Sequence, residues 1–184
     1  YAGLDNELRG YAGNLLANTP ESPEMKCLTL LATIGDNQSW NSRKNSAGHK
    51  AIPLPSSQAV GQIPMIAQLI IQFGLDISHV VKPEPALILE HGQKTFNVFY
   101  VPVATASPYV PAQDTFVIPY GIKSALGFGG MLPDGNLFAI IMFSKVHISR
   151  DKADLFKTLS LSSKMAVLPF TEGPIFADIK ESGE

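Results

Sequence analysis

The chain has little of several features that define common classes of protein. Cys27 is its one cysteine, so no disulfide can form within the chain, and this favours a reducing compartment. Charged residues make up only 16% of the sequence, and the basic ones form no stripe that would attract nucleic acid. No apolar run is long enough to span a bilayer, and no signal-peptide pattern is visible. We therefore expect a cytoplasmic chain that binds no nucleic acid and has no membrane span in this segment.

Motifs of common catalytic and metal sites are also missing. The sequence contains no G-x-x-x-x-G-K-[ST], H-E-x-x-H or G-x-S-x-G string. The four histidines, His49, His79, His91 and His147, are spaced too irregularly to define a metal site. The glycines of residues 127–130 resemble a phosphate loop only superficially, because no helix follows them, and a bulge or close backbone approach explains them better. We expect no catalytic residue and no metal.

Length and composition indicate one domain with helical extensions. The 184 residues carry a formal net charge of −2, and apolar residues make up 45%, which is enough for a sizeable core. A surface with so few charges suggests that a partner or a neighbouring domain covers part of it. The chain begins with Tyr1 rather than methionine, so we expect a piece of a longer protein whose other parts hold any catalytic output.

The most informative segment spans residues 120–145. Two apolar runs flank the turn sequence Pro133 to Asn136, and this pattern predicts a β-hairpin. A helix over 149–168 follows directly; Ser149 can cap it and Pro169 ends it. Its apolar residues are spread around nearly the whole circumference of the helix. We therefore expect burial on more than one side, with one side against the sheet and another against a partner chain. A hairpin that leads into a C-terminal helix is typical of small sensory domains.

The first half of the chain predicts helices over 5–18 and 56–73. Pro64 either kinks the second helix or begins a new segment. A strand over 25–33 is apolar enough for burial on both faces, with Cys27 as a core residue rather than a reactive thiol.

Less regular segments separate these elements. The polar stretch 35–57 predicts a long functional or disordered loop that ends in extended chain at 52–55. Short apolar pieces lie at 80–90, a strand is expected over 95–103, and the tail 171–184 is expected outside the core. The order of elements predicts an α+β fold with an antiparallel sheet and flanking helices.

Several strings in this order resemble the GAF domain, a relative of PAS domains. Gly121-Ile122-Lys123-Ser124 precedes a strand, as a similar string does in GAF domains, and the hairpin and helix follow. Residues 40–43, 48–55, 64–70 and 107–113 are similar to a divergent GAF-like subgroup found beside PAS and histidine-kinase modules in bacterial signalling proteins.

The resemblance covers most of residues 25–170 and implies a domain at 23–170 between linkers at 1–22 and 171–184. It implies N- and C-terminal helices that pack together and mediate homodimerisation, and a cavity for a cyclic nucleotide, bilin, haem or small metabolite. Cys27 lies on the first expected strand, which argues against covalent bilin attachment. The Asn-Lys-X-Phe-Asp-Glu signature of cyclic-nucleotide binders is absent. A PAS-type strand order stays open.

Polar and aromatic residues in the loops and strands are candidates for ligand binding: Trp40, Arg43, His49, Tyr100, Tyr109, Tyr120 and Phe128. The basic cluster around His49 could face an anion or simply be a solvated loop, and Tyr100 could belong to the core. A haem would need an axial ligand, which His49 or His91 could supply, but the cofactor stays unknown.

The function that the resemblance implies is that of a sensor domain in a two-component or similar system. It would bind a small molecule, contact neighbouring signalling domains and relay a signal through its terminal helices, without catalysis of its own. Two alternatives stay open: a structural dimerisation module with no ligand, and a small enzyme that uses His49 and Arg43.

Overall fold

The computed structural model describes residues 1–16, 19–46, 48–83, 97–173 and 176. The chain forms two compact units. Unit 1 combines Tyr1–Pro55 with Pro169–Glu184, and unit 2 is Ser56–Leu168. Both contain helices and antiparallel strands, so the predicted α+β class is confirmed. The boundaries of the units differ from the domain boundaries expected at 22/23 and 170/171, which stay a prediction.

Unit 1 is built on a helix and a two-stranded antiparallel sheet. α1 (Asn6–Leu16) confirms the first predicted helix. β1 (Lys26–Thr29) pairs with β2 (Ala51–Leu54), with Cys27 opposite Pro53. The core of this unit lies between α1 and β2 and consists of Leu4, Leu8, Ala12 and Ala51, with Tyr1, Tyr11, Cys27 and Phe176 packed against it.

Three expectations for unit 1 are corrected. All four residues of β1 are only half-buried, so the predicted burial of that strand on both faces is wrong. The stretch 35–57 is not one continuous loop, because it contains two short 3-10 helices, η1 (Gln38–Asn41) and η2 (Arg43–Asn45). The extended chain predicted at 52–55 is confirmed by the buried strand β2. The tail is not entirely outside the core, because Phe176 packs against the core of unit 1.

Unit 2 contains a three-stranded antiparallel sheet in the order β3-β4-β5. Its strands are β3 (Val98–Val101), β4 (Ser124–Met131) and β5 (Leu137–Ser144). The last two form the predicted hairpin, in which Gly135 takes a positive φ of 76° and the Asn136 amide donates to Asp134 Oδ1 at 2.9 Å. A positive φ is a conformation that glycine adopts without steric cost, so the turn follows from local chemistry.

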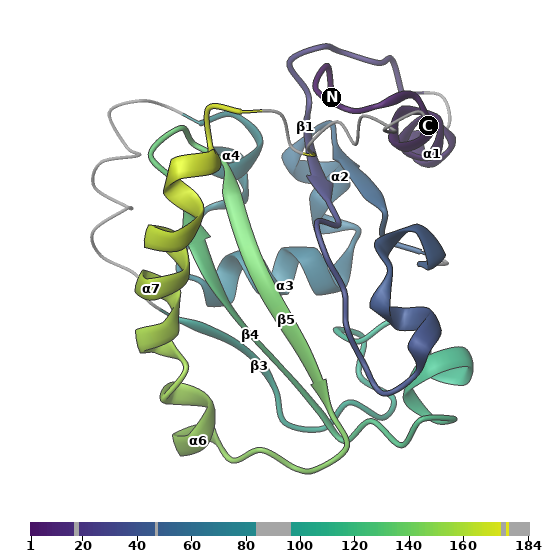
Figure 1. The fold of residues 1–184 in the computed structure, drawn as a ribbon, viewed down its shortest axis with the longest axis vertical. Coiled ribbons are helices and arrows are strands. Elements are labelled where there is room, and N and C mark those ends of the chain that lie inside the picture. The colour runs from purple at the N-terminus through teal and green to yellow at the C-terminus, as the bar shows by residue number, and fades with distance from the viewer. Residues whose placement is uncertain (17–18, 47, 84–96, 174–175, 177–184) are drawn as a thin grey trace, which may run out of the picture. The chain divides into compact units, whose positions relative to one another are not determined.

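Helices cover both faces of this sheet, with α7 on one side and α3 on the other (Figure 1). The predicted helix at 56–73 is two helices, α2 (Ser57–Gly61) and α3 (Pro64–Gln72), and Pro64 begins the second one. α4 (Ile77–Val81) contains residues that were expected in short apolar pieces. The remainder of that stretch, together with His91, lies outside the described residues.

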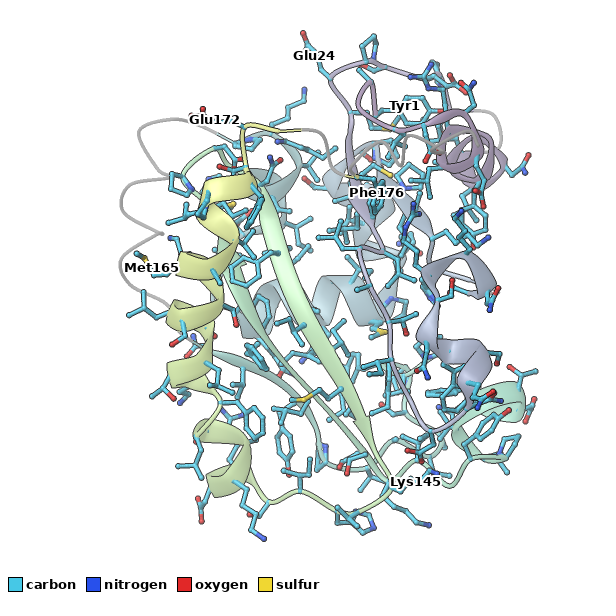
Figure 2. The ribbon with its side chains drawn as sticks, in the orientation of Figure 1. Tyr1, Glu24, Lys145, Met165, Glu172 and Phe176 are labelled. Carbon is cyan, nitrogen blue, oxygen red and sulfur yellow. The ribbon has the colours of Figure 1, made fainter. Side chains whose placement is uncertain are left out.

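The predicted C-terminal helix is also two helices, α6 (Arg150–Asp154) and α7 (Lys157–Val167). Ser149 occupies the N-cap position, but its side chain makes no capping hydrogen bond, so that part of the prediction is wrong. Burial of a second side against a partner chain stays a prediction; in this chain several large apolar residues of the segment are exposed: Leu155, Leu159, Leu161 and Met165. Met165 extends away from the sheet in Figure 2.

Candidate functional site

The structure divides the candidate ligand-binding residues between the two units. Unit 1 holds three of them, Trp40, Arg43 and His49, and unit 2 holds the other four, Tyr100, Tyr109, Tyr120 and Phe128. Each group has to be considered by itself.

Arg43 lies at the start of η2, and its guanidinium stacks on an aromatic ring. Its Cζ atom is 3.5 Å from the centroid of the Phe176 ring. This is a cation–π contact at close range, and a planar guanidinium is well suited to it. The contact gives Arg43 an aromatic partner within the chain, where the sequence had suggested an anionic ligand.

His49 follows in the same part of unit 1 with an unusual backbone conformation. Its φ is +60°, in the left-handed region that histidine seldom adopts. Burial lowers the pKa of its imidazole below the ordinary value, because the charged form loses solvation. Among the described residues no hydrogen bond joins His49 to Arg43, and the small-enzyme alternative stays a prediction.

Lys50 and Trp40, in the same part of the sequence, also make contacts within unit 1. Lys50 Nζ forms an ion pair with Glu7 Oε1 of α1 at 3.1 Å. Trp40 packs against Gly35, where an added Cβ would lie 2.6 Å from the indole Cε3 atom. The ion pair holds this loop to α1, and the contact between Trp40 and Gly35 packs the loop against its own backbone.

Tyr100 on β3 is anchored through its backbone and its side chain. Its amide donates to Gln72 Oε1 at 2.6 Å, and Gln72 Nε2 donates to its carbonyl at 3.3 Å. Its hydroxyl donates to the carbonyl of Ile148, just before α6. The Arg150 guanidinium lies 5.7 Å from its ring centroid. These contacts support the interpretation of Tyr100 as a packing residue that links the sheet to the C-terminal helices.

Phe128 on β4 belongs to the core on the same face of the sheet. It is 6% exposed and clusters with Val98, Leu126 and Ala153. Its ring centroid is 6.0 Å from that of Phe156, between α6 and α7. Phe128 therefore packs the helices onto the sheet.

Tyr109 and Tyr120 lie in the loops around η3, a π-helical turn at Gln113–Val117, and both are more than a third exposed. Tyr120 lies 6.0 Å from Phe116, measured between ring centroids, and Phe116 lies edge-on to Phe143 at 5.1 Å. These two tyrosines, like His49, are candidates that the fold leaves exposed to solvent.

Gln113 organises the loop that carries Tyr109, and the sequence analysis missed it. Its Nε2 donates to the carbonyls of Ala104, Ser107 and Val110 at 3.0, 3.3 and 2.6 Å. Its Oε1 accepts from the amide of Ala106 at 2.9 Å. Ala106 and Ala112 both take positive φ values, 57° and 59°. A loop with left-handed alanines persists only where its surroundings fix it, and Gln113 supplies that constraint.

Ser124 was likewise missed as a structural link. Its side chain is fully buried, and its Oγ donates to the carbonyl of Val146 at 2.8 Å. The same Oγ accepts from the amide of Ile148 at 3.3 Å. The serine at the end of the Gly-Ile-Lys-Ser string thus fixes the segment between β5 and α6. A serine at the start of an apolar strand needs a hydrogen-bond partner once it is buried. This position is the sequence signal that could have identified Ser124 as a structural link.

The described residues hold no group of three or more histidine, cysteine or acidic side chains that could bind a metal. Burial raises the pKa of the Cys27 thiol to about 11, so this cysteine is a poor nucleophile at neutral pH. In the described part of the chain, no helix is both long and apolar enough to cross a membrane.

Comparisons with known proteins add no family for this chain. No family model matches it, and neither a curated protein nor a solved structure shows significant similarity to it.

Proposed function

We propose that this chain is a GAF-like sensory module of a bacterial multidomain signalling protein such as a sensor histidine kinase. It binds a small molecule, catalyses no reaction and relays binding through its C-terminal helices to a neighbouring output domain. The ligand-binding part of the proposal rests on the sequence resemblance. One structural observation supports the relay of a signal to the C-terminal helices. That observation is the direct attachment of the start of α6 to the sheet.

Three contacts make this attachment. The Tyr100 hydroxyl donates to the Ile148 carbonyl, Ser124 Oγ accepts from the Ile148 amide, and Phe128 packs against Phe156. Both backbone groups of Ile148 are therefore bonded to side chains of the sheet. A change in the position of β3 or β4 must move the beginning of α6, or break these bonds. Such a linkage suits a domain that reports a small conformational change.

Native mass spectrometry and an absorption spectrum of the purified chain test for the ligand. A retained small mass or a visible band would support the sensor, and hydrogen exchange with and without that ligand would then show slower exchange in α6 and α7. Tyr100→Phe removes the bond to Ile148 and should reduce this transmitted protection while the ligand still binds. A chain without any ligand, whose exchange no GAF-type ligand class alters, would contradict the proposal.

A structural dimerisation module is the second candidate, and the outer face of α7 favours it. All of its exposed positions are uncharged: Thr158, Leu159, Leu161, Ser162, Met165 and Ala166. A solvent-facing helix surface normally carries charges, so this face is suited to contact with a second copy. Sedimentation of wild type and Met165→Glu tests it: a concentration-dependent dimer that the glutamate abolishes supports the module, and a monomer at high concentration contradicts it.

A further inference from the structure

The most unexpected contact in unit 1 joins the two separated parts of its sequence. The chain leaves this unit at Pro55, forms unit 2, and returns at Pro169. Phe176 of the returning segment packs against the core formed by α1 and β2. In Figure 2 it lies among the side chains of unit 1.

The Phe176 ring packs against a surface of buried apolar side chains. Leu4, Leu8 and Ala12 on the α1 side and Ala51 on β2 are each at most 7% exposed. An aromatic side chain that covers such a surface removes a large apolar area from water. Tyr11 and Cys27 pack against the same cluster.

Arg43 also contacts the Phe176 ring. Its guanidinium lies 3.5 Å from the ring centroid. Among the described residues no carboxylate pairs with Arg43. Within the described part of the chain, the Phe176 ring is therefore the partner that orients the Arg43 guanidinium.

We propose that unit 1 contains a binding site for an aromatic side chain, formed by α1, β2 and Arg43, and that Phe176 occupies it as a releasable latch. The contact joins Phe176 to elements of unit 1 that lie far earlier in the sequence. One partly buried ring and one stacked cation form a contact small enough to open while the rest of unit 1 stays folded. The latch does not depend on the proposed sensory function, because it requires no ligand.

The ring current of Phe176 gives a direct test by NMR in the full chain. The arginines are Arg9, Arg43 and Arg150, so selective labelling of arginine gives a simple spectrum. The Arg43 side-chain signals should be shifted upfield in the wild type. Phe176→Leu keeps an apolar side chain but removes the ring, and should return these signals to unstacked positions. Phe170→Leu is the matched control, because Phe170 is 77% exposed in the same segment.

Cys27 supplies a second readout, since it is the only thiol and packs on the same cluster. Phe176→Ala should raise its rate of modification by a disulfide reagent by about tenfold, as expected for loss of a contact of this class. Phe170→Ala should leave the rate unchanged. The latch is refuted if the Arg43 signals of wild type and Phe176→Leu coincide. It is also refuted if the two alanine variants react at the same rate.

Discussion

Gly129 on β4 allows a close approach of two backbones, and its replacement by alanine should break the hairpin. An added Cβ would lie 2.1 Å from the Phe138 carbonyl oxygen and 2.8 Å from Ala139 Cα. Both atoms belong to the backbone of β5, so no rotation of a side chain can relieve the overlap. The two strands would have to separate or change their register.

The neighbouring glycine provides a matched control. An added Cβ at Gly130 would meet nothing within 4 Å. Alanine there should be neutral or stabilise by about 0.5 kcal/mol, because glycine loses more backbone entropy on folding. Overpacking a tight site costs roughly 1–3 kcal/mol, and a clash with backbone alone lies at or above the upper end. Gly129→Ala should therefore destabilise by at least about 3 kcal/mol.

Urea unfolding of the wild type and both variants, followed by circular dichroism, measures the difference. For a chain of this size, 3 kcal/mol corresponds to a fall in melting temperature of about 6–12 °C. Hydrogen exchange should place the loss in β4 and β5. Equal stability of the two alanine variants would refute the close approach and with it the register of the hairpin.

Three further predictions concern the polar side chains of Ser160, His49 and Gln113. Ser160 has a buried hydroxyl without a hydrogen-bond partner among the described residues, so Ser160→Ala should stabilise by about 1 kcal/mol in chemical unfolding, and the partly buried Ser163→Ala by less. His49 has a lowered pKa, so its contribution to stability is present above the ordinary pKa of about 6.5 and is lost as pH falls below it. The melting temperatures at about pH 7.5 and 5.5 should therefore lie closer together in His49→Asn than in the wild type, whereas His147→Asn should keep the wild-type difference. Asparagine also tolerates the positive φ of residue 49. Gln113→Glu replaces a donor to three carbonyls by an acceptor and should destabilise unit 2 by about 2 kcal/mol or more in the same assay.

Local chemistry made the hairpin and several boundaries predictable. The turn from Pro133 to Asn136 needs only neighbouring residues to form, and the start of a helix at Pro64 and the stop at Gly74 are equally local. The close approach at Gly127 and Gly129 was also foreseen from glycines inside a strand pattern.

Contacts between distant residues account for what the sequence did not reveal. The periodic pattern over 149–168 suggested one helix, but Phe156 packs on Phe128 and the helix divides there into α6 and α7. The sequence analysis gave Gln72 and Gln113 no role, because their partners are backbone groups. Every residue has such groups, so composition gives no indication of which ones a glutamine will bind.

These contacts also narrow where a ligand can bind. Tyr100 and Phe128 are committed to the attachment of the helices, and Arg43 is stacked on Phe176. The loop from Ala104 to Gln113 is different, because it is fixed by one glutamine, contains two strained alanines and leaves Tyr109 exposed. Backbone strain of this kind persists where a rigid shape is required. If the chain binds a small molecule, the ligand should slow hydrogen exchange first in this loop. Slower exchange confined to η2 would contradict this and would assign ligand binding to unit 1.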